Sequence, residues 1–221
     1  MIFILFVGLI VAGAIANAIM ARKRQEALLG LAQRLNLDFD PRQNFAIPGR
    51  FDFLKQLDQG DNRYAINLLS GSYQQNEILA FDYHYETYST DDKGNQTTHH
   101  HWFSFFILML PVMFPDLTIR REGFFTKIAT LFGYQDIQFE SAEFSKTFCV
   151  RSPDKKFAYD VCHARMMEYL LANRDLSLEI ENDVIALAFS DRISAEAFEF
   201  NLQRLNQIRS LVPEYLFAKT L

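Results

Sequence analysis

The residues of this chain best suited to chemistry are histidines and a glutamate on either side of a polar turn. With Lys93-Gly94 as the centre of the turn, strand alternation places four of these side chains on one face, with facing Cβ atoms about 5 Å apart. Three imidazoles and one carboxylate are suitable ligands for Zn²⁺ or a similar divalent ion. The pattern therefore predicts a candidate zinc site made of His84, Glu86, His99 and His101.

The same residues also fit a solvated hairpin tip, in which His and Glu make ordinary cross-strand contacts. The expected register pairs Glu86 with His101, and a shift of one residue would move the partners to opposite faces. The sequence identifies no open coordination position and no water-activating base, so catalysis at this tip is not expected. Solvated imidazoles gain charge near about pH 6–7, which makes a pH-sensitive surface a second interpretation.

No other motif indicates catalysis or cofactor binding. Cys149 and Cys162 are too few for a disulfide framework and lack nearby metal ligands, so both are interpreted as small buried hydrophobic residues. Cys162 and His163 would point about 100° apart on a helix and cannot form a nucleophile–base pair. We therefore predict no catalytic residue and no cofactor other than the candidate zinc. A non-enzymatic binding or scaffold module is favoured, with a metal sensor or metal-dependent enzyme as the alternative.

The first 21 residues contain no ionisable side chain and are followed directly by Arg22-Lys23-Arg24. A helix of that length measures about 31 Å, which matches the ~30 Å hydrocarbon core of a bilayer. A cleaved signal peptide would carry its positive charges before the apolar run, whereas here they follow it. We therefore expect residues 1–21 to form a single transmembrane helix. Residues 22–221 would form a domain on the cytosolic side of a bacterial inner membrane.

Two further expectations concern partners. Gly8, Ala12 and Ala16 recur at four-residue spacing, which would allow two membrane helices to approach closely in a homodimer. The chain carries 22 basic and 27 acidic residues and has no basic stripe beyond Arg22-Lys23-Arg24, so nucleic-acid binding is not expected. A binding or scaffold module would instead require a protein partner, which the sequence does not identify.

The remaining pattern predicts an α+β domain built on an antiparallel β-meander. Period-two alternation appears in three consecutive runs separated by short polar turns, at residues 63–73, 77–88 and 97–110. The third run becomes continuously apolar over residues 105–110, which indicates burial on both faces. Pro111 and Pro115 interrupt the pattern, so a subdivision of the domain near residue 116 is considered.

Helices are predicted to flank this meander. The first directly follows the membrane segment and presents a narrow apolar stripe of Leu28, Leu31, Ala32 and Leu35. Three more helices are expected at residues 122–132, 153–173 and 194–212. A hairpin that turns at Asn182-Asp183 is expected between the last two helices. The predicted fold is therefore an antiparallel β-meander with flanking helices, preceded by a single transmembrane helix.

A family resemblance is carried by three stretches: SGSYQQNEILAFDYHYET, THHHWFSFFILMLP and FESAEFSKTFCVRSPDKKFAYDVCHARMMEYLL. Their order resembles a family of uncharacterised bacterial membrane-anchored proteins, which share a short N-terminal membrane segment and a cytosolic domain of unknown function. The most specific part is the pattern Phe-x-Val-x-Ser-x-Asp-x-x-x-Ala, here Phe148 to Ala158. The resemblance covers most of residues 22–210 and implies a bacterial, membrane-anchored domain without implying an activity.

Overall fold

The computed structural model describes residues 2–121 and 136–218, with side chains described from residue 12 onward. Within these ranges the strands are β1 (Asp38–Asp40), β2 (Asp61–Tyr73), β3 (Asn76–Thr90), β4 (Gln96–Arg121), β5 (Phe148–Arg151) and β6 (Ser177–Ala188). The helices are α1 (Ile2–Leu35), α2 (Ala46–Arg50), α3 (Ala142–Thr147), α4 (Lys155–Val161), α5 (Ala164–Ala172), α6 (Ala197–Leu211) and α7 (Glu214–Phe217). The strands form one sheet in the order β1-β2-β3-β4-β5, and β6 pairs with β4. All neighbouring strands are antiparallel, which confirms the predicted α+β class.

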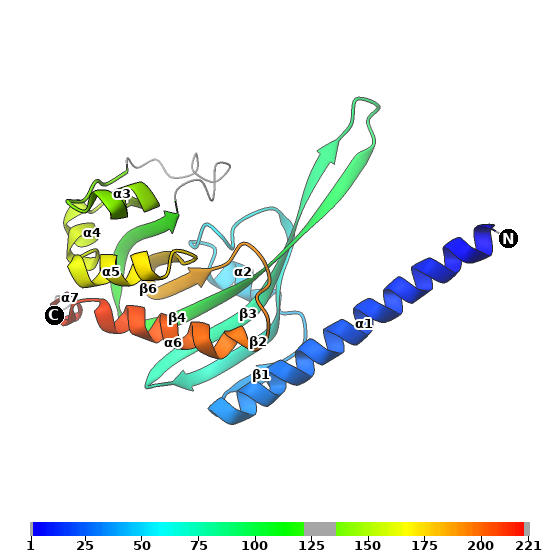
Figure 1. The fold of residues 1–221 in the computed structure, drawn as a ribbon, viewed down its shortest axis with the longest axis horizontal. Coiled ribbons are helices and arrows are strands. Elements are labelled where there is room, and N and C mark those ends of the chain that lie inside the picture. The colour runs from blue at the N-terminus through cyan, green and yellow to red at the C-terminus, as the bar shows by residue number, and fades with distance from the viewer. Residues whose placement is uncertain (1, 122–135, 219–221) are drawn as a thin grey trace.

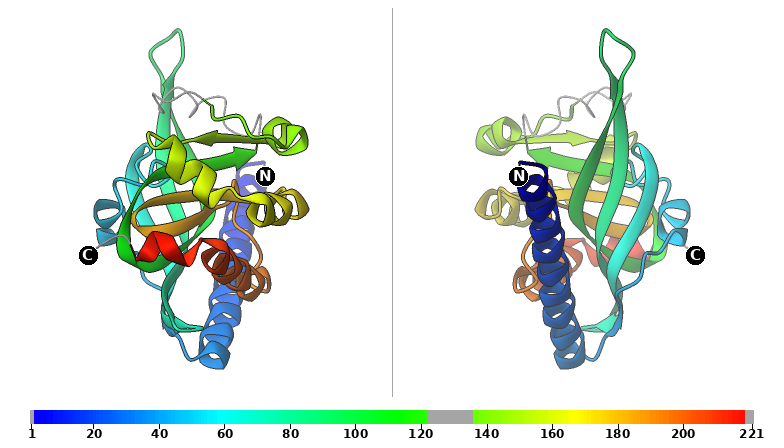
Figure 2. Two further views of the ribbon diagram at one scale, coloured as in Figure 1. Left: turned by 90° about the vertical axis from the view of Figure 1, so that its left-hand side faces the viewer. Right: turned by 90° about the vertical axis from the view of Figure 1, so that its right-hand side faces the viewer.

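Two apolar cores lie on the two faces of the sheet. Helices α4, α5 and α6 cover one face, and α2 lies on the other (Figure 1 and Figure 2). Along β4, Phe106 and Leu108 belong to the core under the helices, whereas Phe105 and Ile107 belong to the core under α2. This alternation confirms the prediction that this part of the third strand is buried on both faces.

Helix α1 is uninterrupted, and its two halves have different surroundings (Figure 1). Its C-terminal half packs into the larger core through Leu28, Leu31 and Ala32, as the apolar stripe predicted. Its N-terminal half projects away from the body, and the described side chains there, such as Ile15 and Met20, are exposed. Among the residues whose side chains are described, no helix is long and apolar enough to span a membrane.

Arg24 joins α1 to the sheet. Its guanidinium donates two hydrogen bonds of 2.6 Å to the carboxylate of Asp82, whose side chain is fully buried, and a third of 2.8 Å to the backbone oxygen of Ile193. Asp82 also accepts hydrogen bonds from Asn67 Nδ2 at 2.9 Å and from Ser104 Oγ at 3.0 Å. The sequence placed Arg24 in one basic triplet with the two residues before it. The structure instead makes it part of a polar network inside the domain.

Strand β4 continues through both prolines at which the sequence predicted a break. The register between β4 and β6 shifts on both sides of Phe114. Pro111 and Pro115 therefore fall where the ladder is already irregular, which is where a strand tolerates a residue without an N–H donor. The subdivision considered near residue 116 falls inside this continuous strand.

Strand β6 is also continuous, and the predicted hairpin at Asn182-Asp183 is wrong. Asn182 has a left-handed φ of 51°, which is compatible with a tight turn and with a bulge. It pairs with Phe114 at the irregular part of β4. Because the long edge of β4 offers partners to both halves of the segment, the chain forms a bulge and continues along that edge.

The helix predicted at residues 153–173 is divided into α4 and α5 at Cys162 and His163. His163 has a ψ of 170°, which ends the helical path between the two segments. Its Nε2–H donates a hydrogen bond of 2.8 Å to the backbone oxygen of Leu211 at the end of α6. This contact gives His163 a structural role. The helix predicted at residues 122–132 lies outside the described residues.

Three carboxylates of β4 and β6 lie beneath the segment around Lys55. Glu179 accepts a hydrogen bond of 3.1 Å from the backbone N–H of Lys55 and one of 3.3 Å from the guanidinium of Arg120. Burial raises the pKa values of Asp116, Glu179 and Glu181. The pKa of Glu181 reaches about 7, so this carboxyl group is largely protonated in weakly acidic solution.

We expect Glu181→Gln to stabilise the protein at about pH 8 but not below about pH 5. Between the usual pKa of 4.5 and about 7, the folded protein holds a proton that the unfolded chain has released, so stability falls as pH rises through this window. The amide removes that loss, which amounts to about 1 kcal/mol after allowance for solvent screening. Urea titrations at both pH values measure the difference. Glu168→Gln, on the exposed side of α5, is the control, and an equal effect of Glu181→Gln at both pH values would contradict the prediction.

Candidate functional site

The histidine-rich hairpin brings three ligand atoms together where it leaves the sheet. His84 and Glu86 lie on β3, and His100 lies on β4; we call these three residues the histidine cluster. The distance from His84 Nε2 to His100 Nδ1 is 3.1 Å, and Glu86 Oε1 lies 3.2 Å from His100 Nδ1 and 4.0 Å from His84 Nε2. The pairing of β2 with β3 ends at Glu86, and beyond it β3 and β4 continue as a projecting hairpin (Figure 1).

The predicted register of this hairpin is wrong by one residue. Glu86 pairs with His100 rather than with His101, because the loop between Thr90 and Gln96 has an odd number of residues and is centred on Lys93 alone. Side chains alternate along a strand, so the shift moves two predicted ligands to the opposite face. The zinc site predicted at His84, Glu86, His99 and His101 is therefore divided between two faces, and His100 completes the set on one of them.

The two displaced histidines make local contacts on the other face. His101 Nε2 lies 2.8 Å from Thr87 Oγ1, and the His101 ring stacks on Tyr85 with centroids 4.5 Å apart. His99 Nε2 lies 2.7 Å from Ser89 Oγ. Among the described residues, neither histidine belongs to a group of three convergent metal ligands. Their contacts are the ordinary cross-strand contacts considered as the alternative.

Neighbouring rings and a backbone oxygen fix the orientation of His84. Its ring centroid lies 4.6 Å from that of Tyr64 and 4.5 Å from that of Trp102, and the residue is 2% exposed. Its Nδ1 lies 3.1 Å from the backbone oxygen of Asn62. Since a carbonyl oxygen can only accept, Nδ1 carries the hydrogen and Nε2 keeps a free lone pair. Metal-binding histidines commonly have this arrangement.

Hydrogen bonds also fix Glu86 and set its charge. Asn62 Nδ2 donates to Glu86 Oε1 at 2.8 Å, and the Tyr88 hydroxyl donates to Oε2 at 3.1 Å. The hydrogen bond from Asn62 is the largest cause of the lowered pKa of Glu86, and burial lowers the pKa of His84. At neutral pH the cluster therefore contains a carboxylate beside a neutral imidazole, which are the protonation states that bind divalent metals.

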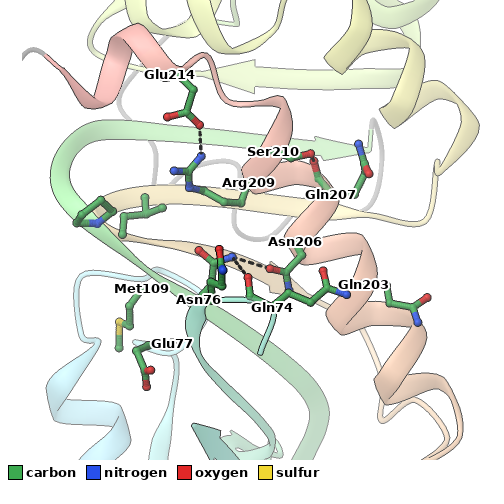
Figure 3. A pocket seen from close by; sticks show the side chains of 13 residues that line it. Gln74, Asn76, Glu77, Met109, Gln203, Asn206, Gln207, Arg209, Ser210 and Glu214 are labelled. Carbon is green, nitrogen blue, oxygen red and sulfur yellow. Dashed lines mark hydrogen bonds and ion pairs between the residues drawn. The ribbon is translucent and has the colours of Figure 1, made fainter. Parts of the chain in front are cut away.

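A second candidate site is a groove of about 920 Å³ between the β2–β3 turn and α6 (Figure 3). Its lining is rich in side-chain amides, which come from Gln74, Gln75, Asn76, Gln203, Asn206 and Gln207. We call it the amide groove. Met109, Leu110 and Pro111 of β4 add an apolar part to its wall. The groove lies at the opposite end of β3 from the projecting hairpin.

Some polar groups of the amide groove are paired, and others are available to a ligand. Asn76 Nδ2 donates to Asn206 Oδ1 at 2.7 Å, and Arg209 pairs with Glu214 at 3.0 Å (Figure 3). Three lining amides form no side-chain hydrogen bond with another described residue: Gln75, Gln203 and Gln207. Each amide offers donors and an acceptor without net charge, so the groove suits an uncharged polar ligand such as a peptide backbone.

Sequence reasoning missed the amide groove. Gln203, Asn206 and Gln207 follow helical spacing of three and four residues, which identifies a polar stripe on α6. The stripe becomes one wall of a groove only because the fold places it beside the β2–β3 turn, more than a hundred residues earlier in the chain.

Comparison with known proteins bears on the fold. No family model and no curated protein matches the sequence. The structure is similar to the crystal structure of the mycobacterial trehalose monomycolate transport factor A, TtfA, with a TM-score of 0.60 and 12% sequence identity. The similarity covers 86% of this chain and 93% of that chain. At this level of identity it is evidence for a shared fold and carries no residue-level assignment.

Proposed function

We propose that this chain is a membrane-tethered, non-enzymatic binding or scaffold module of a transport assembly. The observation that carries the proposal is the division of α1 into a docked half and a projecting half. The projecting half exposes Ile15, Ile19 and Met20, and it belongs to the apolar run of residues 1–21. An apolar helix whose described side chains are exposed is suited to burial in a bilayer. The shared fold with a transport factor supports the transport part of the proposal.

In this proposal residues 1–21 cross the inner membrane of a bacterium, and the remaining domain faces the cytosol. Arg24 is bound to Asp82, so the positive flank that sets the orientation is reduced to Arg22 and Lys23. Helix α1 has no break between the apolar run and the docked half. The domain is therefore held against the membrane by a stiff helix, and its faces keep a constant orientation toward the bilayer.

We assign partner binding to the amide groove. Its uncharged amides at Gln75, Gln203 and Gln207 can bond to the backbone groups of an extended protein segment. Arg209 and Glu214 form an ion pair within the lining, which leaves Glu77 as its remaining charged side chain. The groove lies at the end of β3 away from the projecting hairpin, so a partner bound there leaves the histidine cluster accessible.

Photo-crosslinking in intact cells tests the tether and the partner site together. With a benzophenone amino acid at Gln203, we expect the full chain to form a covalent adduct with one protein. Both components should stay in the membrane pellet after carbonate extraction. The same amino acid at Asp92, an exposed position in the hairpin loop, is the matched control and should not give that adduct. Identical adducts from both positions would contradict partner binding in the amide groove.

A variant of the apolar run separates the tether from the partner site. Each charged residue at the centre of a membrane helix costs about 2.5–3.5 kcal/mol of insertion, so Ile10→Asp combined with Ile15→Asp should move the chain to the carbonate supernatant. Ala27→Asp lies on the exposed side of the docked half and should leave the chain in the pellet. Recovery of the unmodified chain in the supernatant would contradict the membrane tether.

A further inference from the structure

We propose that the histidine cluster binds a divalent transition-metal ion, and that Zn²⁺ is the ion it fits best. The ligand atoms are His84 Nε2, His100 Nδ1 and Glu86 Oε1. The set contains one residue, His100, that the expected register did not include. The inference is independent of the membrane tether and of the amide groove.

The spacing of the three atoms is close to that of a tetrahedral zinc site. Bonds of about 2.0–2.1 Å from zinc to nitrogen or oxygen place neighbouring ligand atoms about 3.3 Å apart. The separations within the cluster are 3.1, 3.2 and 4.0 Å. Only the distance between His84 and Glu86 must shorten, by about 0.7 Å for that geometry.

His84 Nε2 and Glu86 Oε1 both converge on His100 Nδ1 as acceptors, and both have lone pairs that a cation could use. His84 Nε2 is an acceptor, because its other nitrogen donates to the Asn62 backbone oxygen. Glu86 Oε1 already accepts one hydrogen bond from Asn62 Nδ2 and keeps a further lone pair. His100 Nδ1 supplies at most one hydrogen to these two acceptors, and in its other tautomer it supplies none. A cation at the centre of the three atoms interacts favourably with all of them at once.

One side of the histidine cluster is accessible to solvent. His84 is 2% exposed, whereas the side chain of His100 is 58% exposed, so the cluster has a buried side and a solvent side. Three protein ligands with one accessible position are typical of zinc sites that hold a water or an exchangeable ligand. The ligands come from both β3 and β4, so a bound ion would link the two strands at the base of the hairpin.

The single tryptophan of the chain provides a local readout. The ring centroid of Trp102 lies 4.5 Å from that of His84. The full chain should be prepared in detergent without a polyhistidine tag and stripped of metal with a chelator. Co²⁺ bound at the histidine cluster is expected to quench Trp102 fluorescence with one ion per chain, and Zn²⁺ should restore the fluorescence by displacing it.

Variants with matched controls decide whether the histidine cluster is the site. His100→Ala and Glu86→Gln should each weaken Co²⁺ and Zn²⁺ binding by at least about tenfold, since even outer-shell changes reduce metal affinity 10–100-fold. His99→Ala removes a histidine from the opposite face of the same hairpin and should leave binding unchanged. Circular dichroism checks that every variant is folded. Absence of quenching in the unmodified chain, or equal weakening by His99→Ala and His100→Ala, would overturn the proposal.

Discussion

Replacement of Arg24 by methionine is expected to lower the free energy of unfolding by about 3–5 kcal/mol. Methionine keeps the helical propensity and much of the apolar length of the side chain, so the lost interaction is the charge pair. Asp82 would remain fully buried with hydrogen bonds only from Asn67 and Ser104. Because Arg24 also connects α1 to the backbone of Ile193, the docked half of the helix should loosen. Urea unfolding of the full chain in detergent measures the loss.

Arg22→Met is the matched control for this prediction. The Arg22 side chain is 82% exposed and pairs only with Glu26, four residues along the same helix, so its loss should change stability by less than about 0.5 kcal/mol. Arg24→Met combined with Asp82→Leu removes both charges and should recover part of the stability. Equal losses from the two arginine variants would show that the buried pair does not fix α1.

Replacement of Gly60 by alanine is expected to lower the free energy of unfolding by about 2–3 kcal/mol. A Cβ at this position would overlap the backbone oxygen of Glu86 and come within 2.7 Å of a ring carbon of Tyr85. The loop before β2 must therefore move away from β3. Asn62 lies two residues after Gly60, at the start of β2, and contacts both Glu86 and His84, so the substitution should also weaken metal binding at the histidine cluster.

Gly94→Ala separates the steric effect of an added Cβ from the cost of a left-handed backbone conformation. Gly94 also has a positive φ, of 83°, but an added Cβ there would meet nothing within 4 Å. Its replacement should therefore cost only the left-handed backbone preference, about 1 kcal/mol, and should not alter metal binding. Thermal unfolding and Co²⁺ titration of both variants test this, and similar results for Gly60→Ala and Gly94→Ala would contradict the close packing at Gly60.

The features predicted correctly from sequence depend on local periodicity. Alternation identified β2, β3 and the first part of β4, and the apolar run ending at Leu110 identified burial on both faces. The spacing of Leu28, Leu31 and Ala32 identified the docked side of α1. Such patterns can be recognised in a sequence because the polarity of each side chain depends on whether its face of the helix or strand is buried.

The register of the hairpin required information about the loop. Asp91 Oδ1 accepts hydrogen bonds from the backbone N–H groups of Lys93 at 2.9 Å and Asn95 at 2.8 Å, and Gly94 adopts the left-handed region. This compact loop centres the hairpin on one residue instead of on a pair. Asp, Gly and Asn at these positions are a usable signal, but alternation alone is equally consistent with either register.

Contacts between distant segments could not be predicted from local patterns. The sequence shows the charge of Arg24 but does not identify its partner. Asp82 lies on β3, and β3 and α1 come together only in the folded chain. Similarly, an asparagine at position 182 is typical of a turn. The strand continues through it because the edge of β4 is available for pairing. Both outcomes depend on packing that brings elements together over long sequence separations.

The pairing of β4 with β6 also determines when the domain can be completed during synthesis. Phe105 pairs with Ala188, so one edge of β4 has no partner until the ribosome has added the whole intervening segment. At about 5–20 residues per second, this interval lasts roughly 4–17 s. During that time an apolar strand edge of the nascent chain can associate with other strands or with chaperones that bind unfolded chains. The synthesis of β6 therefore determines when this edge of β4 is protected from association with other strands.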